Sequence, residues 1–98
     1  MKLKTILTIT ALLLPNIGST TTIEPDAIID GNNDFTVEQM RELSVMASRL
    51  VAVHGYQCFT ISSFTKFVWS MGFNLSCNNH SDHFDLTLSG RNWIITKD

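Results

Sequence analysis

The chain has 98 residues, of which 44% are hydrophobic and 16% are charged, and its formal net charge at pH 7 is −2. This length is enough for one small domain whose core alone supplies only about 3–5 kcal/mol of stability. Its seven lysines and arginines are scattered. Nucleic acids and anionic membranes, which need clustered cations, are therefore not expected as partners.

The first nineteen residues have the three parts of a secretory signal peptide. Lys2 and Lys4 give a positively charged start, the mostly apolar run from Leu3 to Leu14 gives the core, and small residues around Gly18 offer a cleavage site. The run is too short to span a bilayer, so no stable membrane anchor is expected after cleavage. We therefore predict a signal peptide over 1–19 and an exported protein, periplasmic or secreted.

Residues 20–34 mix threonine, proline, glycine, asparagine and acids without a helical or strand period. The sequence predicts a flexible acidic leader here. Its apolar residues, among them Ile23, Ile28 and Ile29, would also suit docking into a groove.

A helix is predicted from Thr36, where local signals are complete. Thr36 and Gln39 have the spacing of a capping box, and Gly55 stands where a helix ends. Apolar side chains recur at three- and four-residue steps and define the inward face; these are Met40, Leu43, Ala47, Leu50 and Val51, with His54 at the end. We interpret His54 as a structural residue that bonds a terminal carbonyl.

The only two cysteines, Cys58 and Cys77, predict one disulfide in an exported chain. A loop of about twenty residues closed in this way contributes about 3 kcal/mol in the chain-entropy model. The alternatives are a redox pair, which needs a Cys-x-x-Cys spacing, and a nucleophilic Cys58 served by His54. The spacing favours neither alternative.

A second, two-turn helix is predicted after Ser62 or Ser63. Four apolar residues repeat at helical spacing before Gly72; they are Phe64, Phe67, Val68 and Met71. Trp69 falls on the opposite side, so it is either covered by the leader or exposed as a binding anchor.

Three strand-like runs follow, at residues 73–78, 84–89 and 93–95, because apolar and polar residues alternate there. The expected fold class is α+β, with two helices packed on one face of a three-stranded antiparallel meander and the Cys58–Cys77 disulfide. Residues 35–98 form this single domain.

The residues Gly55-Tyr56-Gln57-Cys58 and Gly72-Phe73-Asn74-Leu75-Ser76-Cys77-Asn78, with a closing strand that contains Trp93, resemble a family of small exported bacterial proteins of uncharacterised function. The resemblance covers residues 36–97. It implies no activity, cofactor or catalytic residue.

The chain lacks the sequence motifs of common hydrolases, zinc proteases and phosphate-binding loops. We therefore expect no enzyme and no cofactor. His80, Asp82 and His83 lie close together in a polar turn and offer imidazole and carboxylate ligands. Zinc or copper binding by these three residues is the alternative function.

The leading hypothesis is a small exported, non-enzymatic protein-interaction module that binds a protein partner or itself. Apolar side chains on the outer faces of the predicted helices, next to cationic residues, suggest the surface; it consists of Trp69, Lys66, Val45, Arg49 and Val53.

Overall fold

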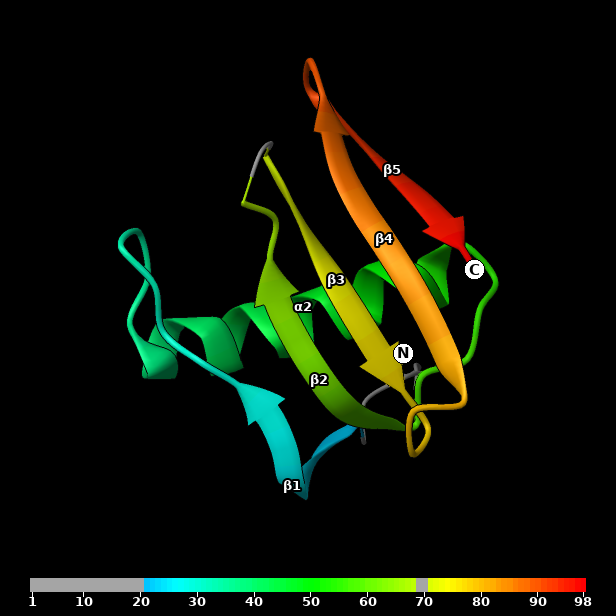
Figure 1. The fold of residues 1–98 in the computed structure, drawn as a ribbon. Helices are drawn as coiled ribbons and strands as arrows, with labels where there is room; N and C mark the ends of the chain where they lie inside the picture. The colour runs from blue at the N-terminus through cyan, green and yellow to red at the C-terminus, as the bar shows by residue number, and fades with distance from the viewer. Residues whose placement is uncertain (1–20, 69–70) are drawn as a thin grey trace, which may run out of the picture.

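The computed structural model describes residues 21–68 and 71–98, which form one helix and five strands (Figure 1). The elements are β1 (Thr22–Ile29), α2 (Val37–Val53), β2 (Thr60–Lys66), β3 (Gly72–Cys77), β4 (Asp82–Ser89) and β5 (Asn92–Lys97). The predicted signal peptide and Trp69 lie outside the described residues.

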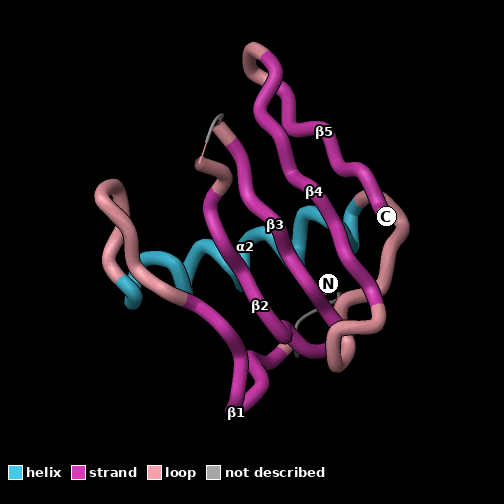
Figure 2. Tube along the Cα trace, in the orientation of Figure 1, coloured by secondary structure: helices cyan, strands magenta, loops and turns pink. Residues whose placement is uncertain are grey.

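The five strands form one mixed sheet in the order β1-β2-β3-β4-β5. β1 and β2 are parallel, whereas every later neighbouring pair is antiparallel. The helix α2 connects the two parallel strands and crosses one face of the sheet (Figures 1 and 2). β1 and β5 are the two edges.

The predicted fold class is therefore wrong in both layers. The described residues form one helix rather than two, and the sheet has five strands with a parallel pair rather than three in an antiparallel meander. The expected meander exists as β3, β4 and β5, but it is only part of the larger sheet.

The predicted start of the helix is confirmed in detail. The backbone N–H of Gln39 donates to the Thr36 hydroxyl over 3.1 Å, and the Thr36 N–H donates to the Gln39 side-chain oxygen over 2.9 Å. This reciprocal capping box satisfies two backbone donors that have no partner within the helix. Gly55 follows the helix with a φ of +92°, a conformation that costs glycine little.

The buried face of α2 includes two polar residues that the sequence did not indicate. Ser44 and Ser48 are almost completely buried, and each hydroxyl donates to the backbone carbonyl three residues earlier, Arg41 and Val45, over 2.6 Å. These local bonds satisfy the hydroxyls without a partner from the sheet. Small side chains at Ser44, Ala47 and Ser48 thus face the sheet, while His54 is exposed.

The second predicted helix is wrong, because residues 60–66 form strand β2. A register shift between Ile61 and Ser63 in the pairing with β3 makes Ser62 an extra residue. This bulge places Ile61 and Phe64, three positions apart, both in the core. The helix was predicted from the spacing of Phe64, Phe67, Val68 and Met71, but only Phe64 of these lies in a strand, because β2 ends at Lys66 and β3 begins at Gly72. Val68 and Met71, expected inside, are exposed.

The prediction of a flexible leader is wrong for residues 22–29, which form β1. Ile29 is buried, and Ile23 and Ala27 pack against the core. The pairing with β2 shifts register between Ile23 and Ile28. This irregular segment, which contains Pro25, removes the alternation by which a strand is recognised.

The core lies between α2 and the inner face of the sheet and contains stacked aromatic rings. Phe64 and Phe73 stack with centroids 4.8 Å apart, and Tyr56 packs on Phe84 at 5.3 Å. The helix contributes Met40, Ala47 and Val51 to the same cluster. Among the described residues, no helix has the length and apolar character needed to cross a membrane.

Candidate functional site

An open pocket of about 260 Å³ lies between α2 and the sheet. Four of its lining residues come from the helix and one from each of the strands β2 to β5; they are Leu43, Met46, Ala47, Leu50, Phe64, Phe73, Leu86 and Trp93. Because its lining is predominantly apolar and it is open to solvent, we take this pocket as the candidate site.

The helix lines the pocket because its residues follow the 3.6-residue period. Leu43, Met46, Ala47 and Leu50 fall at i, i+3, i+4 and i+7 and so share one side of α2. Ala47 is buried, whereas the Met46 side chain is 61% exposed and lies at the rim.

The sheet supplies the opposite wall. Phe64, Phe73 and Leu86 are almost fully buried and come from three adjacent strands, so their positions are held by the ladder of the sheet. Trp93 belongs to the edge strand β5, is only partly buried, and lies 6.3 Å from Phe73 between ring centroids. The wall is therefore buried at its centre and partly exposed at β5.

The lining of the pocket favours the binding of an apolar group over the catalysis of a reaction. None of the described residues that line the pocket has a titratable side chain. A proton-transfer group or a nucleophile needs such a residue within hydrogen-bond reach of the reacting atoms. An apolar group that enters the pocket gains about 25 cal/mol for each Å² of apolar surface removed from water.

A second structured region surrounds the predicted disulfide, which the structure confirms. Cys58, in the segment after α2, bonds Cys77 at the end of β3, with 5.3 Å between the two Cα atoms. Both residues are buried. The bond cannot reach a substrate from this position, so its role is structural.

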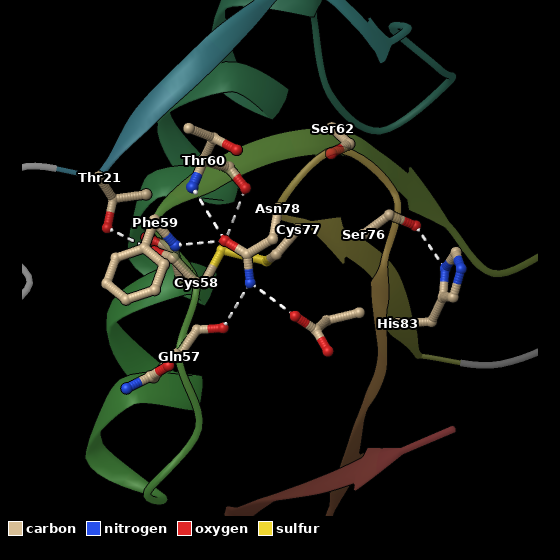
Figure 3. The surroundings of a disulfide bond; sticks show 12 residues. Thr21, Gln57, Cys58, Phe59, Thr60, Ser62, Ser76, Cys77, Asn78 and His83 are labelled. Carbon is tan, nitrogen blue, oxygen red and sulfur yellow. Dashed lines mark hydrogen bonds between the residues drawn. A yellow bond between two sulfur atoms is a disulfide. The ribbon is translucent and has the colours of Figure 1, made fainter.

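Asn78 fixes the segment that contains the disulfide (Figure 3). Its side-chain oxygen accepts from the backbone N–H groups of Phe59 and Thr60, over 2.8 and 3.4 Å. Its amide nitrogen donates to the Gln57 carbonyl over 3.0 Å and to the Asp82 carboxylate over 2.7 Å. Asn78 has a φ of +58°, a conformation that asparagine tolerates better than most residues.

Glu24 of β1 reaches across the sheet to the same turn. One carboxylate oxygen accepts from the hydroxyls of Ser62 and Thr60, each over 2.6 Å, and from the Asn79 N–H over 2.9 Å. These bonds favour the ionised form and hold the pKa of Glu24 below its usual value of 4.5. The Asn78 amide similarly lowers the pKa of Asp82, with a smaller effect from Lys97.

Two of the three predicted metal ligands, Asp82 and His83, have separate partners, and His80 is exposed in the turn before β4. The Asp82 carboxylate binds Asn78 and Lys97, and His83 shares a hydrogen bond of 2.8 Å with the Ser76 hydroxyl (Figure 3). Asp82 and His83 are consecutive in β4, so their side chains point to opposite faces of the sheet. No group of three or more histidine, cysteine or acidic side chains suited to a metal occurs within residues 21–68 and 71–98.

The described residues of the predicted interaction surface do not form one continuous surface in the structure. Lys66 pairs with Asp34 over 3.2 Å, just before the start of α2, whereas Arg49 and the 81%-exposed Val53 lie near its other end. A helix of this length separates its ends by about 24 Å. Val45 is half-buried against the core. Of the members of this surface that the structure describes, only Arg49 and Val53 therefore share an exposed surface, and Trp69 lies outside the described residues.

His54 behaves as the sequence indicated. Its Nδ1 lies 2.9 Å from the Leu50 carbonyl oxygen, one of the last acceptors of α2. Its place on the inward face is not confirmed, because the residue is exposed after the final turn.

Sequence reasoning missed the pocket as a site. Every lining residue was interpreted as core or not singled out, because apolar periodicity does not distinguish a filled space from an open one. The exposure of Met46 on the inner side of the helix arises only from the tertiary arrangement. Comparison with known proteins does not help here, since no family model, curated protein or solved structure matches the chain.

Proposed function

We propose that this protein is a small exported, non-enzymatic binding domain whose pocket between α2 and the sheet takes an apolar side chain of a protein partner. The supporting observation is an open pocket lined only by hydrophobic residues, with the exposed Met46 and the partly buried Trp93 at its rim. Export rests on the signal-like sequence of residues 1–19, and the Cys58–Cys77 disulfide fits an oxidising compartment.

The size of the pocket favours part of a larger partner over a whole small molecule. Pockets that bury a small-molecule ligand have volumes of about 300–1,000 Å³. The pocket here, about 260 Å³, lies just below that range. It fits one large side chain, and an apolar anchor in a pocket is the usual centre of a protein interface.

The test uses N-acetyl-phenylalanine amide as a probe and backbone amide NMR as the readout. Saturable shifts are expected at the rim, at Met46, Leu50 and Trp93. Ala47→Leu fills the pocket and should abolish them, whereas Ala52→Leu adds the same atoms to a helix position outside the lining and should leave them intact. Shifts that do not saturate, or that respond equally to both variants, contradict the proposal.

A further inference from the structure

The two edges of the sheet are built differently. At the β1 edge, Pro25 lacks an N–H and the pairing with β2 is irregular between Ile23 and Ile28, which prevents another strand from adding there. At the β5 edge the six pairs with β4, from Phe84–Lys97 to Ser89–Asn92, follow without a shift. β5 contains no proline, and among the described strands none lies on its outer side (Figure 1).

The register identifies the backbone groups that β5 presents outward. Asp98 N–H donates to the His83 carbonyl over 2.9 Å, so this pair is hydrogen-bonded. Hydrogen-bonded and non-hydrogen-bonded pairs alternate in an antiparallel ladder. It follows that Ile94 and Thr96 bond β4, whereas the N–H and C=O groups of Trp93, Ile95 and Lys97 point away from it.

Lys97 is the only charged residue within β5, and two residues of opposite charge, Arg91 and Asp98, flank the strand. Residues 92–96 carry no charge, and Lys97 is paired with Asp82 over 3.4 Å. Among the described residues, Arg91 before the strand and Asp98 after it form no ion pair. Ile94 is 49% exposed on the face away from α2.

We propose that β5 pairs with β5 of a second copy of this chain, antiparallel about a two-fold axis at Ile95. This arrangement lets the three outward residues bond one another, with Ile95 opposite itself and Trp93 opposite Lys97 of the second copy. It sets Asn92 opposite Asp98 of the second copy and brings Arg91 within one residue of that carboxylate.

Charge selects this pairing over its alternatives. A parallel pair would place each unpaired end charge beside the same charge of the second copy, and an antiparallel pair centred on Ile94 would set Arg91 opposite Lys97. Of these three arrangements, only the register centred on Ile95 brings Arg91 of each copy near Asp98 of the other copy, so opposite charges meet at both ends of the paired strands. The dimer is formed by outward backbone groups of β5, although the side chain of one of these residues, Trp93, also lines the pocket. The proposal rests on the register and charges of the strand and not on the proposed function.

The first test compares two charged variants at positions that face each other across the axis, Ile94 and Thr96. The variant I94K/T96K sets lysine against lysine twice, and I94K/T96E sets lysine against glutamate twice at nearly the same cost to β5 itself. Sedimentation equilibrium should show a wild-type dimer at high concentration, association weaker by about tenfold in I94K/T96K, and recovery in I94K/T96E. A wild-type monomer throughout, or equal association of the two variants, overturns the proposal.

The second test fixes the register by oxidation of single-cysteine variants. I94C and T96C should each fail to cross-link alone and should form a disulfide dimer when mixed, because position 94 faces position 96 in a non-hydrogen-bonded pair. Native amide exchange spectra establish that each variant is folded. Efficient cross-linking of either variant alone overturns the register, and a lack of cross-linking in the mixture overturns the edge pairing.

Discussion

The carboxylate of Glu24 accepts a hydrogen bond from the buried Ser62 hydroxyl, with 2.6 Å between the oxygens. The bond joins β1 to the bulge residue of β2, where the pairing of the two strands is irregular. The side chain therefore replaces part of the missing ladder. Ser62 Oγ also accepts from the His80 N–H over 2.9 Å, which connects β1 to the turn between β3 and β4.

Replacement of Glu24 by glutamine should loosen β1 while the rest of the sheet keeps its pairing. A neutral amide oxygen is a weaker acceptor than a carboxylate for the three donors that converge on it. Amide hydrogen exchange of Ile23 and Ile29 should accelerate relative to β3 and β4. Asp26→Asn, an exposed change on the same strand, is the control and should leave exchange unchanged.

Acidification should destabilise the wild type more than it destabilises Glu24→Gln. The folded-state pKa of Glu24 is lowered by its bonds with Ser62 and Thr60, so its contribution is complete above the unfolded pKa and is lost as pH falls through the folded value. The denaturant midpoint of the wild type should therefore fall more steeply than that of Glu24→Gln as the pH drops below the usual glutamate pKa of 4.5. Parallel midpoint curves for the two proteins would contradict this role of Glu24.

Asn78 should be the most sensitive position of the β3–β4 turn. Asn78→Ala removes both acceptor and donor contacts with residues 57–60 and leaves the Phe59 and Thr60 N–H groups without that partner, a loss of about 2–4 kcal/mol. Asn79→Ala, with the same φ of +58°, has only the backbone cost of about 1 kcal/mol. Equal free energies of unfolding for the two variants would show that the side-chain bonds of Asn78 contribute nothing.

Removal of the disulfide should cost a large part of the total stability. Its sequence separation is 19, and a loop of this size gives about 3 kcal/mol in the chain-entropy model. The double variant Cys58→Ser/Cys77→Ser should therefore unfold at a clearly lower denaturant concentration than the oxidised wild type. Reduced wild type is the matched comparison and should behave like the double variant; a reduced protein with an unchanged midpoint would contradict the prediction.

Local signals predicted the parts of the fold that are determined locally. The Thr36–Gln39 capping box specified the start of α2, and regular alternation specified β3 and β4. The disulfide followed from the count of cysteines alone. These features need only neighbouring residues or a chemical rule.

The two strands that the sequence analysis did not predict, β1 and β2, are irregular, so they lack the regular alternation by which a strand is recognised. The extra residue Ser62 converts the period of two in β2 to a step of three, and the irregular segment of β1 hides its pairing with a strand about forty residues away. The leader was assigned because β1 lacks a regular period. The second helix was assigned because Phe64, Phe67, Val68 and Met71 repeat at helical spacing, although the last three lie between β2 and β3 rather than within one element. The pocket was not predicted because its walls come from one helix and four strands, and the sequence does not show how these elements are arranged in space.

Gly72 should not tolerate a side chain. A Cβ at this position would lie 2.5 Å from the Leu86 carbonyl oxygen of β4 and 2.8 Å from the ring of Phe67. The Leu86 carbonyl cannot withdraw without opening β3 from β4, and the Phe67 ring must also move, so Gly72→Ala should lose about 2–3 kcal/mol. Gly90→Ala is the control, because its Cβ would meet no atom within 4 Å and only its φ of +64° opposes alanine, at a cost of about 1 kcal/mol. Urea unfolding of both variants measures the difference; a Gly72→Ala protein as stable as Gly90→Ala would mean that β3 and β4 separate at this point without cost.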